Sequence, residues 1–151
     1  MKNFLVTCGA GFIGSHLVDQ LISEKEWNVT VVDNFNDFYS PELKRENIRQ
    51  HQDNPLFHLA ELDICDAAGL RTLFEKSSFD VIVHLAARAG VRPSLENPVA
   101  YVETNINGTM NLLELARDFG IKQFVFASSS SVYGVNEKVP FAESDHIFNP
   151  I

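Results

Sequence analysis

The stretch from Val6 to Leu17 constrains the fold of this chain more than any other, because a short apolar run leads through a glycine-rich turn into a helical pattern. Within it, Gly9, Gly11 and Gly14 have the spacing GxGxxG. Glycines at these positions allow a tight turn and a close approach of the backbone to phosphate groups, and the free N–H groups at the start of the next helix bind the anion. The spacing alone is weak, since ordinary turns also contain it, so the surrounding sequence decides.

The sequence around the turn has the pattern of a strand, a turn, a helix and a second strand. Lys2–Thr7 is apolar enough for a short strand, residues 12–25 carry apolar side chains at helical spacing, and residues 29–32 form another apolar run. This run ends in Asp33. Its separation from the glycine turn along the sequence is close to that expected for a carboxylate that accepts hydrogen bonds from both hydroxyls of an adenosine ribose and repels a 2′-phosphate. Asn34 follows, with no Arg or Lys beside it to bind an extra phosphate. These features indicate NAD rather than NADP; the alternative is that Asp33 is an ordinary turn residue.

The composition is that of one globular domain. The 151 residues include 45% hydrophobic side chains and 12 Phe, enough for a core. A formal net charge of −8 argues against non-specific binding to nucleic acid or to an anionic membrane, because both need a basic surface. Cys8 and Cys65 form neither a CxxC nor a metal-binding spacing, so we expect no disulfide framework and no metal. No apolar run suits a secretory signal or a membrane span, and we expect a cytoplasmic protein.

Strand and helix signals alternate along the rest of the chain. Ser40 and Pro41 begin a charged helix that runs to about residue 52, and Asp66 caps another helix. Asn97 and Pro98 begin a long helix that runs to about residue 119. Further strands are predicted at residues 56–62, 80–85 and 121–127, and residues 135–151 are rich in turn signals. The alternation predicts an α/β fold, a Rossmann-like doubly wound parallel sheet with strand order 3-2-1-4-5.

Polar and small residues gather where the predicted strands end. In an open parallel sheet, ligands bind beyond the carboxyl ends of the strands. Those ends carry the glycine turn, Asp33, Asp63, the small residues at 86–90 and the serines at 128–131. We therefore expect the site at this edge, although polar residues such as the serines also commonly close a strand.

Four other side chains have both a structural and a functional interpretation. His84 lies inside an apolar strand, where a histidine satisfied within the core is more common than a ligand. His16 falls in the first turn of the helix that follows the glycines, which is no position for a base. Arg88 and Arg92 lie on the ligand side of the sheet and could bind a phosphate or a sugar carboxylate, but solvated surface arginines fit the pattern equally well.

The chain contains, in order, the segments TCGAGFIG, VVDNFNDFYSPELKRENI, LDICD, VIVHLAARAGVRPSLENP, TNINGTMNLLELA and FVFASSSSVYG. Together they resemble the extended short-chain dehydrogenase/reductase family and, within it, the nucleotide-sugar 4-epimerases, above all those of the UDP-glucuronate type. The resemblance covers almost the whole chain. It implies a tightly held NAD, a UDP-sugar substrate and a homodimer, with residues 1–151 as a Rossmann domain that is incomplete on its C-terminal side.

The resemblance also implies which residues bind each part of the cofactor. These are Gly9, Gly11, Phe12, Ile13 and Gly14 at the pyrophosphate, Asp33 and Asn34 at the adenosine ribose, Asp63 and Ile64 at the adenine, and Leu85, Ala86, Ala87 and Thr104 along the rest of the NAD.

On the substrate side, the resemblance implies that Ser129 is catalytic and binds the sugar 4-hydroxyl or ketone, with Ser130 and Arg92 as further substrate contacts. In the implied mechanism, a tyrosinate removes a hydroxyl proton while a hydride passes from C4 to NAD. The 4-keto sugar then rotates and the hydride returns to its other face. In the related 4,6-dehydratases, Asp-Glu follows the catalytic threonine; Ser130 and Ser131 stand here, so dehydration is disfavoured.

Two departures from the family pattern matter. Cys8 stands where the family has glycine, at a cost of about 1 to 3 kcal/mol if the backbone needs a glycine-only conformation, unless Gly9 takes over the turn. The sequence also contains no Tyr-x-x-x-Lys, because Tyr39, Tyr101 and Tyr133 have no lysine in that register. We therefore expect an inactive N-terminal fragment of an epimerase about twice this length. The alternatives are a non-catalytic NAD-sensing module and a 4,6-dehydratase or reductase of the same fold.

The resemblance finally predicts an open sheet edge. Sheets of this family continue beyond the fifth strand, so residues 123–127 would present unpaired N–H and C=O groups. We expect self-association through this edge or through the apolar face of the helix at residues 98–119, which the family uses in dimers.

Overall fold

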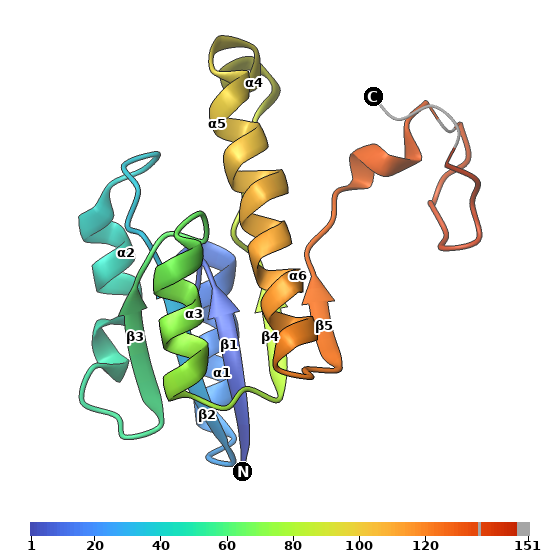
Figure 1. The fold of residues 1–151 in the computed structure, drawn as a ribbon. Coiled ribbons are helices and arrows are strands. Elements are labelled where there is room, and N and C mark those ends of the chain that lie inside the picture. The colour runs from blue at the N-terminus through green and yellow to red at the C-terminus, as the bar shows by residue number, and fades with distance from the viewer. Residues whose placement is uncertain (136, 148–151) are drawn as a thin grey trace.

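The protein is built around a five-stranded parallel sheet in the order β3-β2-β1-β4-β5 (Figure 1). The computed structural model describes residues 1–135 and 137–147. The predicted strand order 3-2-1-4-5 is confirmed. The strands are β1 (Lys2–Thr7), β2 (Trp27–Asp33), β3 (Phe57–Glu61), β4 (Val81–His84) and β5 (Gln123–Phe126).

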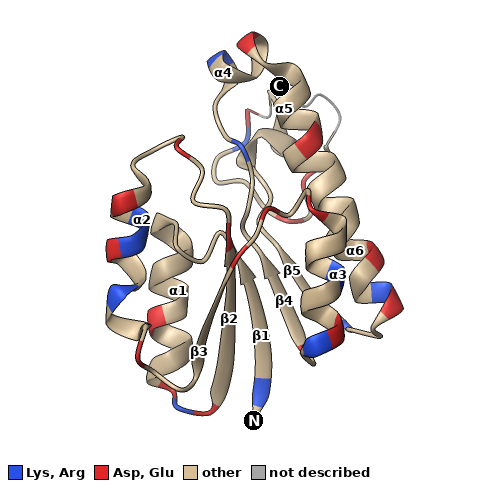
Figure 2. Ribbon diagram, turned by 60° about the vertical axis from the view of Figure 1, so that its left-hand side comes forward, with Lys and Arg blue, Asp and Glu red and all other residues tan. Residues whose placement is uncertain are grey.

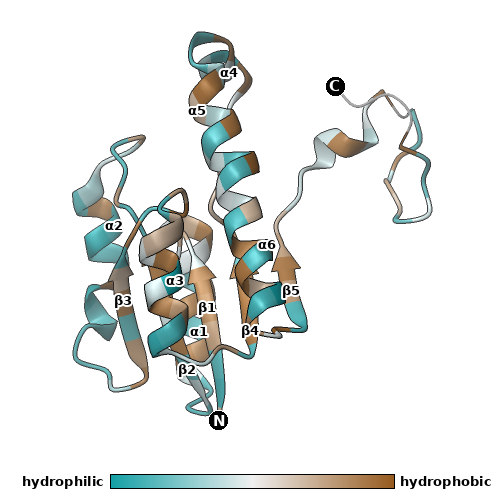
Figure 3. Ribbon diagram, viewed as in Figure 1, coloured by the Kyte–Doolittle hydropathy of each residue, from teal (hydrophilic) through white to brown (hydrophobic). Residues whose placement is uncertain are grey.

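Helices cover both faces of the sheet, as the doubly wound fold requires (Figure 2). On one face, α1 (Phe12–Ser23) and α2 (Pro41–Ile48) close a core that includes Val18, Ile22 and Ile48. On the other face, α3 (Ala67–Lys76) and α6 (Thr109–Asp118) close a second core. Successive strand residues contribute to opposite cores, which explains why the strands are apolar along most of their length (Figure 3).

The predicted helix starts are confirmed in position, but only two of the three form the expected cap. The Asp66 side chain accepts a hydrogen bond from the Gly69 amide at 2.9 Å, and Asn97 accepts one from Ala100 at 3.3 Å. Ser40 precedes α2, but its hydroxyl donates to the Glu42 carboxylate at 2.5 Å and caps no backbone amide. The helix that begins there ends at Ile48, and the 3₁₀ turn η1 (Arg49–His51) replaces its predicted last turn.

The predicted long helix is present, because residues 98–118 are helical without a break, but it is not α-helical throughout. The structure has the short helices α4 (Val91–Glu96) and α5 (Pro98–Tyr101), then the π-helical segment η2 (Val102–Gly108), and then α6. Gly108 lies against Ile64, and a Cβ on it would lie 2.6 Å from the Ile64 Cδ1. The π-helical segment thus ends at a residue that packs against the loop after β3, a contact that helical periodicity does not reveal.

The chain after β5 forms little regular structure. The 3₁₀ turn η3 (Ser130–Tyr133) follows the strand, and residues 137–147 contain turns and bends, as predicted, and neither helix nor strand. Positions 136 and 148–151 of the predicted turn-rich tail lie outside the described residues. Strand β5 forms an edge of the sheet, with Val125 53% and Phe126 54% exposed, as predicted. In the part of the chain that the structure describes, no helix is long and apolar enough to cross a membrane.

Candidate cofactor site

A cavity of about 440 Å³ opens beyond the carboxyl ends of the strands, at the edge where the sequence predicts the site. Its walls come from the glycine turn and the start of α1, the end of β2, the loops that follow β2, β3 and β4, and segment η2. Of the residues that the sequence predicts for NAD binding, the cavity brings together Gly11, Phe12, Ile13, Gly14, Asp33, Asn34, Asp63, Ile64, Leu85, Ala86, Ala87 and Thr104.

Gly9 does not line the cavity, although the sequence places it in the cofactor set. It lies under the turn, where a Cβ would come within 2.6 Å of Val31 Cγ2 on β2. Gly14 has a similar role between the turn and α1, because a Cβ there would lie 2.2 Å from the Cys8 carbonyl oxygen. The glycines therefore permit the close packing of strand, turn and helix that brings the start of α1 to the cavity.

The left-handed position of the turn belongs to Cys8, which has a φ of 55°. The suggestion that Gly9 takes over this conformation is wrong, because Gly9 is not among the described residues with positive φ. The Cys8 carbonyl oxygen accepts a hydrogen bond from the Gly11 amide at 3.0 Å, which closes the turn. A Cβ on Gly11 would lie 2.9 Å from the Cys8 Sγ, so the thiol lies beside Gly11, and both residues line the cavity.

The start of α1 can hold an anion. Gly11 is its N-cap and provides no side-chain cap, and Phe12 and Ile13, which follow, are 74% and 71% exposed and line the cavity. The first amide groups of a helix have no acceptor within it, and the helix dipole adds positive potential there. His16 lies on the same turn, with its Nδ1 2.9 Å from the Phe12 carbonyl oxygen, so it is occupied within the helix, in line with the sequence interpretation.

Asp33 ends β2 as predicted, but the structure gives it a partner that the sequence analysis missed. Its carboxylate accepts hydrogen bonds from Ala10 N–H at 3.3 Å, from Phe35 N–H at 2.9 Å and from Lys44 Nζ at 3.2 Å. No Arg or Lys lies beside Asn34 in the sequence, but α2 brings Lys44 to Asp33 in space. The available signal was that Lys44 lies one turn before the apolar Ile48 on α2, and hence on its buried face.

The predicted adenine end joins the loops after β2 and β3. Asn34 Nδ2 donates to Asp63 Oδ2 at 2.7 Å, and the Cys65 amide donates to Asp63 Oδ1 at 2.8 Å. Burial alone would raise the pKa of Asp63, but these hydrogen bonds and the nearby Arg88 lower it below its ordinary value. Asp63 is thus held as a carboxylate next to the apolar Ile64.

Segment η2 positions the loop of residues 86–90. The Asn105 side chain accepts a hydrogen bond from Arg88 N–H at 2.8 Å and donates to the Arg88 carbonyl at 3.0 Å. Thr104 Oγ1 accepts a hydrogen bond from Arg88 Nε at 3.3 Å. Asn105 was not among the predicted site residues, since an asparagine three residues before a glycine in a helix carries no distinctive signal.

His84 is a core histidine, as its place in an apolar strand predicts. It is 1% exposed, with Nδ1 2.8 Å from Thr7 Oγ1 and Nε2 2.9 Å from Thr109 Oγ1. Burial lowers its pKa to about 4, so the imidazole is neutral near neutral pH. Thr7 Oγ1 also accepts hydrogen bonds from the amides of Leu85 and Ala86, both at 3.1 Å, and so fixes the cavity wall after β4.

The predicted substrate residues do not line this cavity. The wall that leads toward them ends at Ala127, and Ser129 is the N-cap of η3, where its Oγ accepts a hydrogen bond from the Ser131 amide at 3.2 Å. Ser130 begins η3, and Arg92 lies in the separate helix α4.

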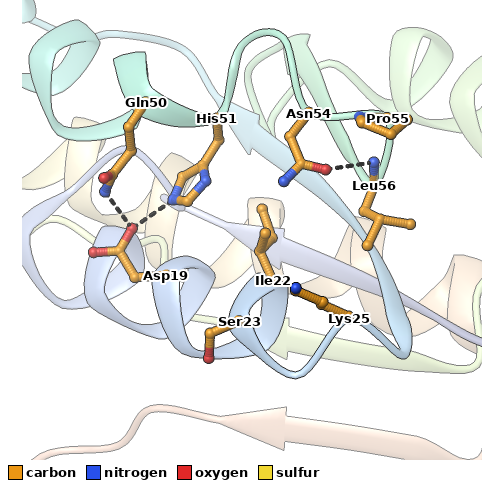
Figure 4. Close-up of a pocket in the computed structure, with 9 residues that line it drawn as sticks. All are labelled: Asp19, Ile22, Ser23, Lys25, Gln50, His51, Asn54, Pro55 and Leu56. Atoms are coloured by element: carbon orange, nitrogen blue, oxygen red, sulfur yellow. Dashed lines mark hydrogen bonds and ion pairs between the residues drawn. The ribbon is translucent and has the colours of Figure 1, made fainter.

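A second hollow lies between the end of α1 and the segment that leads into β3 (Figure 4). Asp19 there accepts hydrogen bonds from Gln50 Nε2 at 2.9 Å and from His51 Nε2 at 2.5 Å. Because these contacts tie α1 to η1 at the end opposite the glycine turn, we assign the hollow a structural role. Among residues 1–135 and 137–147, no three His, Cys, Asp or Glu side chains form a group that could hold a metal ion.

Comparisons with known proteins agree with this geometry. A family model described as GDP-mannose 4,6 dehydratase matches residues 5–151. The UDP-glucuronate 4-epimerase of Thermodesulfobacterium geofontis is 44% identical over 151 residues, which are 100% of this chain and 46% of that protein. The chain therefore spans less than half the length of this relative.

Solved structures show the same relationship. The UDP-glucuronic acid 4-epimerase from Bacillus cereus, in complex with UDP-glucuronic acid and NAD, has a TM-score of 0.86 at 34% identity and covers 97% of this chain and 46% of its own. The UDP-Glc/GlcNAc 4-epimerase from Campylobacter jejuni has a TM-score of 0.87 at 30% identity, covering 99% of this chain and 44% of its own.

Proposed function

Because the chain belongs to the GDP-mannose 4,6 dehydratase family, within the extended short-chain dehydrogenases/reductases, we propose that residues 1–151 are the NAD-binding part of a nucleotide-sugar 4-epimerase of the UDP-glucuronate type. One observation carries this proposal. The N-terminus of α1 and the carboxylate of Asp33 line the same cavity, the arrangement that a dinucleotide needs for its pyrophosphate and its adenosine ribose.

The residues present fit the cofactor along the whole cavity. The α1 amides are suited to the pyrophosphate, and the Asp33 carboxylate is suited to the ribose hydroxyls. The side chains of Ile64, Leu85 and Ala86 offer apolar walls to the adenine and nicotinamide rings. When bound, NAD would supply a hydride acceptor. The role of the chain would be to hold the NAD in place against the sugar.

The substrate roles are proposed by family resemblance. Ser129 would hydrogen-bond the sugar 4-hydroxyl or ketone, with Ser130 and Arg92 as further contacts. Since Ser130 and Ser131 stand where the dehydratases carry an acid and a base, epimerisation is favoured over dehydration. The relatives support a UDP-sugar as substrate, because the B. cereus enzyme was solved with UDP-glucuronic acid.

The chain alone is proposed to be inactive. It contains no Tyr-x-x-x-Lys, and Ser129 has the Ser131 amide as its partner rather than a base. General acid–base help is worth about 10² to 10⁴ in rate, so without it we expect turnover to be slower by that factor. The same absence keeps an NAD-sensing module as the second candidate. Measurable interconversion of UDP-glucuronate and UDP-galacturonate by the purified protein would contradict the proposed inactivity and exclude the sensor.

We also propose that the protein self-associates. Exposed apolar side chains recur every three or four residues along the helical residues 98–118 and form a stripe, and β5 leaves a sheet edge open. The stripe contains Val99, Val102, Ile106, Met110 and Leu113. Light scattering at high concentration is expected to show a dimer, whereas a strictly monomeric species would refute the proposal.

Titration calorimetry with NAD and NADP tests the proposed cofactor. We expect NAD to bind more tightly, because the Asp33 carboxylate repels a 2′-phosphate. Asp33→Asn should narrow the difference, since the amide removes the repulsion. A matched control is Asp37→Asn, an acidic residue of the same loop that does not line the cavity. Equal or tighter binding of NADP by the unaltered protein would overturn the NAD preference.

A further inference from the structure

Tyr39 lies at the glycine turn although it comes from the loop between β2 and α2. Its hydroxyl oxygen is 3.5 Å from the position that a Cβ on Gly11 would occupy, and Gly11 is the N-cap of α1. The side chain is 37% exposed and lines the cavity. The hydroxyl is therefore placed at the end of α1 where the first amide groups have no acceptor within the helix.

Lys44 contacts the Tyr39 ring, and two side-chain-to-backbone hydrogen bonds shape the loop before it. The Lys44 ammonium group lies 5.3 Å from the ring centroid, within cation–π range, and the same group is 3.2 Å from Asp33 Oδ1. Earlier in the loop, the side-chain oxygens of Asn34 and Asn36 accept hydrogen bonds from the backbone amides two residues further on, at 3.0 and 2.9 Å. The loop thus presents the phenol to the turn in a defined position.

The Tyr39 phenol can act as a hydrogen-bond donor. Burial raises the pKa of Tyr39, and the nearby Cys8 and Asp33 raise it further. A hydrogen bond with the backbone of Phe12 lowers the pKa in part. Since the net change is upward from 10, the hydroxyl keeps its proton at neutral pH. A phosphate oxygen at the N-terminus of α1 is an acceptor for such a hydroxyl, and hydrogen bonds to an ionised acceptor are among the stronger ones.

We propose that Tyr39 is a binding residue for the cofactor, whose hydroxyl donates a hydrogen bond to a pyrophosphate oxygen and ties the loop of residues 34–40 to the bound dinucleotide. This inference rests on the proposed function, because it requires the dinucleotide in the cavity. It makes Asp33, Lys44 and Tyr39 a connected row between the ribose end and the pyrophosphate end of the site.

The test compares ligands with and without phosphates. Titration calorimetry with NAD and ADP, and competition of adenosine against NAD, are carried out on the unaltered protein, on Tyr39→Phe and on Tyr133→Phe. Phenylalanine at position 39 keeps the ring beside Lys44 and lacks only the hydroxyl. Tyr133 is the matched control, since it stacks on Phe141 at 4.8 Å and does not line the cavity.

We expect Tyr39→Phe to weaken the binding of NAD and ADP by about tenfold, the effect of losing one hydrogen bond to a charged group, and to leave adenosine binding unchanged. The control should bind all three ligands as the unaltered protein does. Unchanged NAD and ADP affinities in Tyr39→Phe would overturn the inference alone. An equal loss for adenosine would do so too, because the tyrosine would then act on the ribose or the loop. Failure of the unaltered protein to bind NAD would instead overturn the proposed function, and the inference with it.

Discussion

The ammonium group of Lys44 lies 3.2 Å from the Asp33 carboxylate, and the two side chains are only 6% and 1% exposed. The pair joins the end of β2 to α2. The same carboxylate accepts a hydrogen bond from the Ala10 amide of the glycine turn at 3.3 Å. This buried ion pair therefore connects the turn, the carboxylate proposed for the ribose, and α2, whose Lys44 lines the cavity.

Removing the lysine should destabilise the fold, because it leaves a buried carboxylate without its counter-charge. For Lys44→Met we expect the free energy of unfolding in urea to fall by about 3 kcal/mol, at the low end for a broken buried pair, since two backbone amides still bond to Asp33. The double variant Lys44→Met with Asp33→Asn should recover part of the loss.

Arg45 provides a matched surface control for Lys44→Met. It forms an ion pair with Glu61 in which the two side chains are 49% and 52% exposed. Arg45→Met should cost less than about 1 kcal/mol, because solvent screens an exposed pair. Losses of equal size at positions 44 and 45 would show that burial does not set the value of the Asp33 pair.

Replacing Cys8 by glycine should relieve the left-handed backbone at the turn. We expect Cys8→Gly to raise the free energy of unfolding by about 1 kcal/mol and to tighten NAD binding, because the thiol also lies beside Gly11 at the cavity. Lys25 has a φ of 57° far from the cavity, so Lys25→Gly is the matched control for strain alone. It should stabilise the fold without altering NAD affinity, as calorimetry can establish. An unchanged NAD affinity in Cys8→Gly would mean that the thiol does not crowd the cofactor.

His84 should make the fold sensitive to mild acid. Its pKa is lowered from 6.5 to about 4, so between these values the unfolded chain binds a proton that the folded protein excludes. This contribution to stability is fully present above pH 6.5 and is lost as the pH falls toward 4. We expect His84→Gln, whose amide can bond to both threonines, to lose less unfolding free energy over this range. The exposed His58 provides the control, and a His58→Gln variant with the same shallower pH dependence would contradict the assignment.

Local sequence patterns determined the framework of this protein. The apolar runs before Gly9 and Asp33, and the cap signals at Asp66 and Asn97, predict elements that the structure contains, because each depends on neighbours along the chain. The site's edge follows from them, since parallel strands all end at the same edge of the sheet. The resemblance to known motifs then assigned individual residues to that edge.

Only the tertiary structure decided which side chains meet across elements. The pairing of Lys44 with Asp33, the bonds of Asn105 to the Arg88 backbone and the approach of Tyr39 to the turn each join separate segments. Local propensity and residue spacing do not predict such contacts, because the contacts depend on how the helices pack against the sheet. The π-helical segment η2 shows the same limit, since its place against Ile64 is set by packing and not by the helical signal of its own residues.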